Sequence, residues 1–271
     1  MSIFNKHLLA IATGAALAVG AGGTIAAPVF EVTPGSLSGV SSAPFEADFV
    51  NGVSSARVTN IGGFNYDSSG YISYGQFSLA GNPVQSLASG LGSQYGLYAT
   101  FSQTFTCASL LSPGVTCAVT SISLSLYADI WNGVVGNINT FTGATLASAP
   151  TVTDHGSNDV LLGSANLILA GLAGINSLGG AFENVTTNFL LTDAGKAFFT
   201  DPVPFYSLAF SNFNNTSQGI QCNTAGCVGA TIVAINSENG GTDFNSVPEP
   251  ATLALMGLGL LGIGTLRRRK I

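Results

Sequence analysis

Charged residues are scarce in this 271-residue sequence, and basic residues are the scarcest. Lysine, arginine, aspartate and glutamate make up 7% of the chain, with seven basic residues against thirteen acidic ones. Between residues 27 and 250 the only basic residues are Arg57 and Lys196, whereas all thirteen acidic residues fall there, which gives this part a net charge of −11. Nucleic acids and anionic lipids require clusters of lysine and arginine. Nucleic acid is therefore excluded as a partner.

Histidine occurs only twice, and His155 is the only one beyond the N-terminal segment. A hydrolase triad would use His155 as the base for Ser157 or a distant serine. Residues this close in one turn cannot converge, and no G-x-S-x-G motif occurs. Asp154, Asn158 and Asp159 offer oxygens to calcium, but their spacing is not that of an EF-hand loop. The pattern favours a solvated loop before a strand, and calcium binding there stays open.

Paired carboxylates suitable for a glycosidase are also not evident. Such an enzyme needs two placed carboxylates, one of them with a raised pKa. Asp129 and Glu183 lie in candidate strands, and we expect both on the wet face of a sheet. The single tryptophan, Trp131, lies near Tyr127 and Asn132 and offers a sugar platform, although packing at a strand end is its expected role. We therefore expect no enzyme, no catalytic residue, no metal site and no cofactor.

Apolar residues alternate with polar ones instead of recurring at helical spacing. In residues 121–130, Ile122, Leu124 and Leu126 share one face and serines share the other, as in a strand with one buried face. Further candidate strands are residues 55–61, 71–79, 97–105, 160–170, 182–191, 206–213 and 229–235. Residues 192–199 predict one short connector helix. The pattern predicts an all-β fold, an antiparallel β-sandwich or jelly-roll-like domain.

The N-terminus has the parts of a secretory signal peptide. A basic start precedes an apolar run over residues 8–19 and a stretch of small residues. Cleavage after Ala26 places small Thr24 at the third position before the cut, which favours it over cleavage after Ala27. We expect residues 1–26 to be removed; the alternative is an uncleaved N-terminal anchor.

The C-terminus joins a short motif, an apolar run and a basic end. The motif is Val247, Pro248, Glu249 and Pro250, and the basic end is Arg267, Arg268, Arg269 and Lys270. The prolines favour an extended backbone in the motif. As a helix, the uncharged residues 251–266 would measure about 24 Å against a hydrocarbon core of about 30 Å. The pattern predicts a transient stop-transfer segment; a permanent single-span anchor and a buried terminal helix are the alternatives.

This ordered combination resembles the PEP-CTERM sorting signal of Gram-negative bacteria. In that family an exosortase, a membrane protein, processes the tail near the motif. The resemblance implies a protein that is exported through the inner membrane, held there transiently and delivered to the cell surface or extracellular matrix of a host that makes exopolysaccharide. It divides the chain into a signal peptide (1–26), an exported β domain (27–246) and the sorting signal (247–271).

The four cysteines all lie in the exported segment, where disulfides are permitted. Three pairings are conceivable for Cys107, Cys117, Cys222 and Cys227. Local pairing, first with second and third with fourth, is favoured because each pair encloses turn-forming residues. Neither spacing fits a zinc knuckle.

The second half of the exported segment carries a more specific resemblance. Residues 189–199, 201–213, 214–219 and 241–245 look like flocculation-associated PEP-CTERM proteins, with an N-N-T-S-Q and a T-D-F-N pattern before the sorting motif. The resemblance implies a non-enzymatic role in cell aggregation, within floc or biofilm, alongside exopolysaccharide. The alternative is a secreted carbohydrate-binding or polysaccharide-modifying protein.

Overall fold

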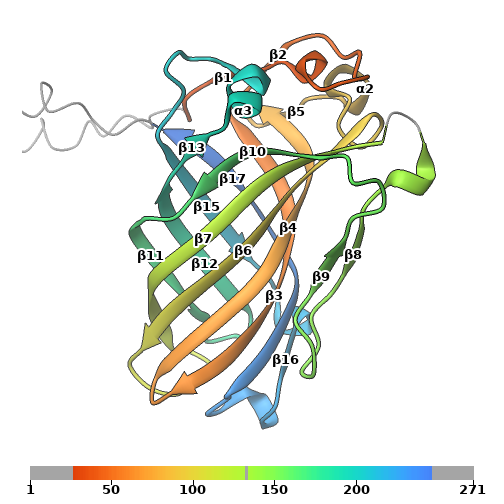
Figure 1. The fold of residues 1–271 in the computed structure, drawn as a ribbon. Helices are drawn as coiled ribbons and strands as arrows, with labels where there is room; N and C mark the ends of the chain where they lie inside the picture. The colour runs from red at the N-terminus through yellow and green to blue at the C-terminus, as the bar shows by residue number, and fades with distance from the viewer. Residues whose placement is uncertain (1–26, 132–133, 246–271) are drawn as a thin grey trace, which may run out of the picture.

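A computed structural model describes residues 27–131 and 134–245, and eight antiparallel strands in it form a closed barrel (Figure 1). The eight strands are β3 (Phe49–Gly62), β4 (Asn65–Leu79), β6 (Tyr95–Cys107), β7 (Thr116–Ile130), β11 (Ile168–Ile175), β12 (Ala181–Asn188), β15 (Leu208–Asn214) and β17 (Ile232–Asn245). Their order around the wall is β11-β12-β15-β17-β3-β4-β6-β7, and β11 pairs with β7 to close it.

The all-β class is confirmed, but the architecture differs in kind from the two packed sheets that we expected. One sheet closes on itself because the free edge of β7 is divided between two partners. Residues 116–118 of β7 pair with β11, and residues 124–129 pair with β10 (Asp159–Ala165). The expected strand over residues 160–170 is accordingly split into β10 and β11, and each of these pairs with a different part of β7.

One end of the barrel, at the top of Figure 1, is closed by an aromatic cap. A three-stranded sheet of β1 (Phe30–Val32), β2 (Phe45–Ala47) and β14 (Phe199–Asp201) lies there with helix α3 (Asp193–Phe198). The ring of Phe30 packs edge-on against Phe199 and Phe244, with centroids 5.9 and 5.3 Å apart. The expected connector helix is thus confirmed as α3, and Thr192 caps it by accepting a hydrogen bond from the Gly195 amide.

The opposite end holds a second hydrophobic cluster and both disulfides. Cys107 is bonded to Cys117 across β6 and β7, and Cys222 is bonded to Cys227, as the local pairing predicted. The buried Tyr66 hydroxyl donates to the Ala230 carbonyl at 2.8 Å and accepts from the Leu111 amide at 2.9 Å. The closing loops are therefore fixed to the wall by covalent and hydrogen bonds.

Smaller elements decorate the barrel. They are β5 (Asn82–Pro83), β13 (Leu190–Leu191), β16 (Ile220–Cys222), helix α2 (Ser86–Ser89) and the 3-10 turns η1 (Pro34–Ser36), η2 (Val135–Asn137), η3 (Ser217–Gly219) and η4 (Ala225–Cys227). The hairpin of β8 (Thr140–Thr142) and β9 (Thr151–Thr153) lies against the outside of the wall (Figure 1). It covers part of β4 and β6, because the ring of Phe141 packs against Tyr71 and Tyr98.

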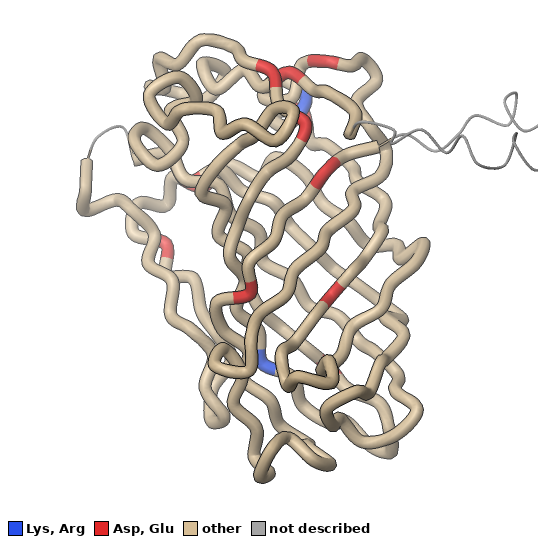
Figure 2. Tube along the Cα trace, turned by 180° about the vertical axis from the view of Figure 1, so that it is seen from behind, with Lys and Arg blue, Asp and Glu red and all other residues tan. Residues whose placement is uncertain are grey.

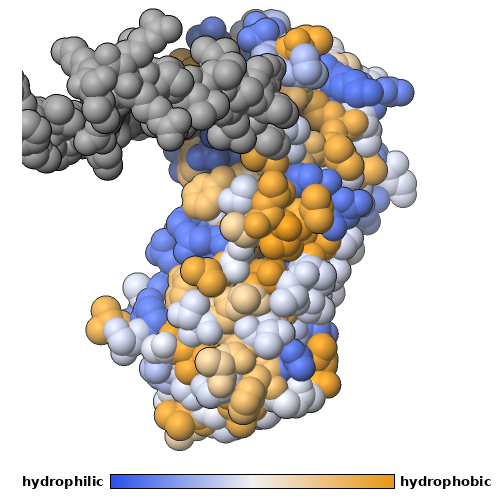
Figure 3. Space-filling view, turned by 90° about the vertical axis from the view of Figure 1, so that its left-hand side faces the viewer, coloured by the Kyte–Doolittle hydropathy of each residue, from blue (hydrophilic) through white to orange (hydrophobic). Residues whose placement is uncertain are grey.

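The described part of the chain carries few charges. Several acidic positions lie close together at the cap, beside a basic one, and the others are set apart along the wall (Figure 2). On the side where β11 lies, apolar and polar side chains are interspersed (Figure 3), and Leu167, Leu169 and Leu172 are about half exposed there.

The predicted signal peptide and sorting signal, including Val247 to Pro250 and Arg267 to Lys270, lie outside the described residues. The processing and membrane predictions made for them stay predictions. Within residues 27–131 and 134–245, no helix combines the length and apolar character needed to span a bilayer.

Candidate functional site

Asp129 does not lie on a wet face, which corrects the prediction made for it. Its side chain points outward from β7, but the segment that leads into the β8–β9 hairpin covers it, and it is 2% exposed. Its carboxylate accepts a hydrogen bond from the Asn139 amide at 2.9 Å. Asp159, directly opposite on β10, accepts from the Asn139 side chain at 2.9 Å and from the Tyr98 hydroxyl at 2.6 Å. Burial raises the pKa of both carboxyl groups.

The aromatic residues near Asp129 form packing contacts. Trp131 is 8% exposed and donates its indole N–H to the Ser93 carbonyl at 3.1 Å, as expected for a residue that packs at a strand end. Tyr127 stacks on Tyr98 with ring centroids 5.2 Å apart. Tyr98 also packs against Phe141, so Tyr98 and Tyr127 form a small core beneath the hairpin, and the rings near Asp129 are engaged in packing instead of forming an open platform for sugar.

The loop around His155 is held by its own turn. The Asp154 carboxylate accepts hydrogen bonds from the Gly156 and Ser157 amides at 2.9 and 2.8 Å. The His155 ring contacts the Thr140 hydroxyl at 3.0 Å. Asp159 is engaged by the partners named above, so the two acidic side chains of this loop serve different contacts. In the described part of the chain no three His, Cys, Asp or Glu side chains group so as to hold a metal ion.

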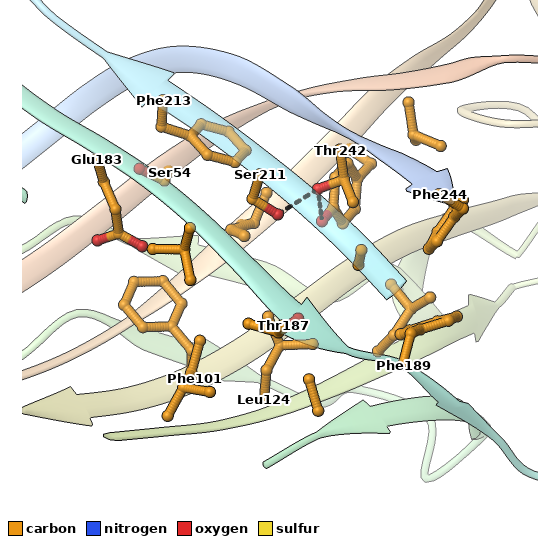
Figure 4. A pocket seen from close by; sticks show the side chains of 18 of the residues that line it. Ser54, Phe101, Leu124, Glu183, Thr187, Phe189, Ser211, Phe213, Thr242 and Phe244 are labelled. Carbon is orange, nitrogen blue, oxygen red and sulfur yellow. Dashed lines mark hydrogen bonds between the residues drawn. The ribbon is translucent and has the colours of Figure 1, made fainter. Parts of the chain in front are cut away.

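Glu183 also departs from its predicted place, because its side chain points into the barrel from β12. There it belongs to a layer of polar side chains that lies between two interior cavities. We call this the polar layer; its members are Ser54, Ser68, Gln103, Glu183 and Glu238. Figure 4 shows Ser54 and Glu183 at one end of the apolar cavity and Phe189 and Phe244 at the other.

Glu238 reaches the polar layer because of a bulge in β17. Ile235 pairs with Ala56 and Glu238 pairs with Ser54, so two residues of β17 face one residue of β3. Before the bulge odd-numbered residues such as Val233 face inward, and after it even-numbered residues do. Ser237 adopts the left-handed conformation at φ +56° to make this shift.

Side-chain hydrogen bonds fix the bulge from outside the barrel. The Ser55 hydroxyl donates to the Asn236 side chain at 2.7 Å. The Asn236 amide in turn donates to the Ala144 carbonyl at 3.0 Å, and the Ala144 amide donates back to the Asn236 oxygen at 2.9 Å. The loop after β8 therefore sets the inward direction of Glu238.

Each carboxylate of the polar layer accepts one hydrogen bond from a neutral donor. The Ser54 hydroxyl donates to Glu238 at 2.6 Å, and the Gln103 amide donates to Glu183 at 2.5 Å. Burial raises the pKa of Glu183. Burial, reinforced by the charge of Glu183 and opposed by the Ser54 hydrogen bond, raises the pKa of Glu238 to about 7.

Two interior cavities meet at the polar layer. The upper one, of about 40 Å³, is lined mainly by apolar side chains such as Ile72, Leu97 and Phe213. The lower one, of about 30 Å³, contains Ser68 and Gln103 in its wall. Glu183 and Glu238 line both cavities. Sequence reasoning missed Gln103 and Glu238. The inward direction of Glu183 could have been predicted, because in a strand it lies on the same face as Ala181 and Val185, which are buried.

A second polar feature lies on the outer wall, where β15, β17, β3 and β4 run side by side. The registers align Asn184, Asn212, Gly241, Asn51 and Gln76 across five neighbouring strands. The next outward row contains Asn214, Asn239 and Ser73. These rows surround an open hollow of about 670 Å³, whose lining residues are all uncharged.

We call this hollow the amide groove and define it by Asn51, Gln76, Asn212, Asn214 and Asn239. The ring of Phe49 also lines the groove. It lies directly over Gly241, where any side chain would collide with it. Asn214, Gln76 and Asn239 are exposed. The groove thus combines an aromatic edge with solvent-facing amide donors and acceptors.

Comparison with known proteins identifies the C-terminal segment alone. The model of the PEP-CTERM protein-sorting motif matches residues 246–270, which include the four motif residues and the four basic residues predicted above. Neither the curated proteins nor the solved structures contain a match to the chain. The resemblance to the flocculation-associated group stays a prediction. The chain therefore ends in a PEP-CTERM protein-sorting motif, which indicates a protein that is exported and sorted to the cell surface of Gram-negative bacteria by exosortase.

Proposed function

We propose that this protein is a non-enzymatic surface or matrix protein that promotes cell aggregation by binding exopolysaccharide, and that the amide groove is its contact with the glycan. The observation that carries the proposal is the chemistry of the groove. It is open, uncharged and lined by amide side chains. Amides donate and accept hydrogen bonds at once, as sugar hydroxyls do.

The absence of charge in the groove favours a neutral glycan. The described residues contain only Arg57 and Lys196 as basic groups, and neither lines the groove. An anionic polysaccharide would find no partner for its carboxylates there. A hollow of about 670 Å³ lies within the range of roughly 300–1,000 Å³ that is typical of ligand sites.

A settling assay in the host tests the aggregation role. A deletion strain complemented with the wild-type gene is expected to settle in flocs, whereas one complemented with the triple variant Gln76→Ala, Asn214→Ala, Asn239→Ala is expected to stay dispersed. Gln85→Ala is the matched control, because Gln85 is an exposed amide that does not line the groove.

Binding is measured in parallel with the purified exported protein and exopolysaccharide isolated from the host. Each lost hydrogen bond is worth about 0.5–1.5 kcal/mol, so the triple variant is expected to bind at least about tenfold more weakly. Equal binding by the triple variant and the wild type would refute the role of the groove. Normal settling of the deletion strain would refute the aggregation role, and release of reducing sugar from the glycan would make the protein an enzyme.

A further inference from the structure

The two carboxylates of the polar layer have no positive partner inside the barrel. The described residues contain two basic side chains, and both are engaged elsewhere. Arg57 donates to the Leu146 carbonyl outside the wall, and Lys196 pairs with Asp193 at the cap. Buried carboxylates must be neutralised, either by a proton or by a cation. No side chain in the described part of the chain supplies that cation to Glu183 and Glu238.

The lower cavity also presents oxygen atoms that lack hydrogen-bond partners. Gln103 turns its amide N–H toward Glu183, which leaves its side-chain oxygen facing the cavity. That oxygen and the Ser68 hydroxyl have no partner among the described residues, although Gln103 is 4% exposed and Ser68 is 2% exposed. Unsatisfied buried polar atoms are rare, and each one calls for a ligand, a water molecule or an ion.

These groups together offer more acceptor oxygens than the neighbouring Ser54, Ser68 and Gln103 side chains can supply with donor hydrogens. The two carboxylates, one amide oxygen and one hydroxyl oxygen are the ligand types that hard cations prefer. A divalent ion balances the two negative charges. The cavity of about 30 Å³ has room for roughly two to three water-sized spheres, since one sphere takes about 10–15 Å³.

We propose that the lower cavity binds one calcium ion between Glu183 and Glu238, with Gln103 and Ser68 as further oxygen ligands. Calcium fits this set better than magnesium because it accepts mixed, irregular oxygen ligands and higher coordination numbers, which water molecules complete. The ligands come from β4, β6, β12 and β17, which the closed barrel alone brings together. Binding of the ion is therefore coupled to closure of the barrel. The site is independent of the amide groove and of the proposed function.

Metal content and thermal unfolding of the exported protein test the proposal. After dialysis against Ca²⁺ and removal of the free ion, we expect one calcium per chain by elemental analysis, and none after EDTA. Ca²⁺ at about a hundred times its Kd should raise Tm by at least about 5 °C relative to EDTA. Mg²⁺ at the same concentration should raise it less.

Variants locate the ion. Glu238→Gln should abolish both the bound calcium and the shift of Tm. Asp154→Asn, in the loop before β10, and Glu46→Gln, on the exposed face of β2, should retain both. If Glu238→Gln does not fold, Glu183→Gln replaces it and should likewise lose the calcium and the shift of Tm, and the amount of calcium bound per wild-type chain tests the proposal without any variant.

Two results would overturn the proposal. A wild-type protein without calcium whose Tm is the same in Ca²⁺ and EDTA would mean that the pair is neutralised by a proton. Calcium that survives Glu238→Gln and is lost in Asp154→Asn would place the ion in the loop instead of the barrel.

Discussion

Glu238→Gln is expected to stabilise the calcium-free protein at high pH and to leave its stability unchanged at low pH. The pKa of Glu238 rises from 4.5 to about 7 on folding, chiefly because its carboxyl group is buried. The folded state therefore holds this proton more tightly than the unfolded state. The stability that this bound proton contributes is fully present below pH 4.5 and is lost as the pH rises to about 7.

The magnitude follows from the size of the shift. A shift of about 2.5 pKa units corresponds to about 3 kcal/mol, at roughly 1.4 kcal/mol per unit. Glutamine imitates the protonated side chain at every pH and does not incur the loss. The variant should thus match the wild type at pH 4 and exceed it by about 3 kcal/mol at pH 8.

Urea unfolding in EDTA, followed at both pH values, measures the difference between the two proteins. Comparison with the variant removes the contribution of the other carboxyl groups, which titrate in both. Glu46→Gln serves as the control, because Glu46 is exposed and its replacement should leave the stability at pH 4 and pH 8 as in the wild type. If the difference in stability between Glu238→Gln and the wild type is the same at the two pH values, the pKa of Glu238 is not raised on folding and the reasoning is refuted.

Three further predictions concern other parts of the chain. Replacing Cys107 and Cys117 by serine removes a link with a sequence separation of 10 residues and should cost about 3 kcal/mol in chemical unfolding; an unchanged midpoint would contradict this. Ser237→Gly should raise the free energy of unfolding by about 1 kcal/mol, because glycine adopts φ +56° without strain; a loss of stability would mean that the bulge is held by the serine itself. Replacing Pro248 and Pro250 by alanine should leave an unprocessed form in the inner membrane, whereas intact-mass analysis of the wild type should show a chain without the basic tail. Finding the C-terminal isoleucine on most exported molecules would make the tail a permanent anchor.

Features that depend on neighbouring residues in sequence were predictable. The alternation of Ile122, Leu124 and Leu126 with serines placed β7 and its buried face, and Leu126 is 4% exposed. The short separation of each cysteine pair was enough to favour local disulfides. The connector helix followed from the cap at Thr192.

Features that depend on distant pairing were not predictable. Closure of the barrel requires β7 to pair with β11 at one end and with β10 at the other. The alternation of apolar and polar residues within β7 does not indicate this change of partner. The inward direction of Glu238 requires the bulge at Ser237, which reverses the parity of β17. Asp129 points outward from β7 as predicted, but that face is not wet, because the segment before β8 covers it and the sequence does not specify where that segment lies.

The last strand of the barrel also determines how the domain carries load. The residues matched by the sorting motif begin immediately after Asn245, where β17 ends at the capped rim. β17 is paired antiparallel with β3 over residues 232–242 and, on its other side, with β15 over residues 239–245. A pull on the tail, against a glycan held on the outer wall, acts along the strand axis. The ladder hydrogen bonds then share the force in parallel instead of opening one by one, so under the proposed function the domain would be loaded along the strongest direction of the sheet.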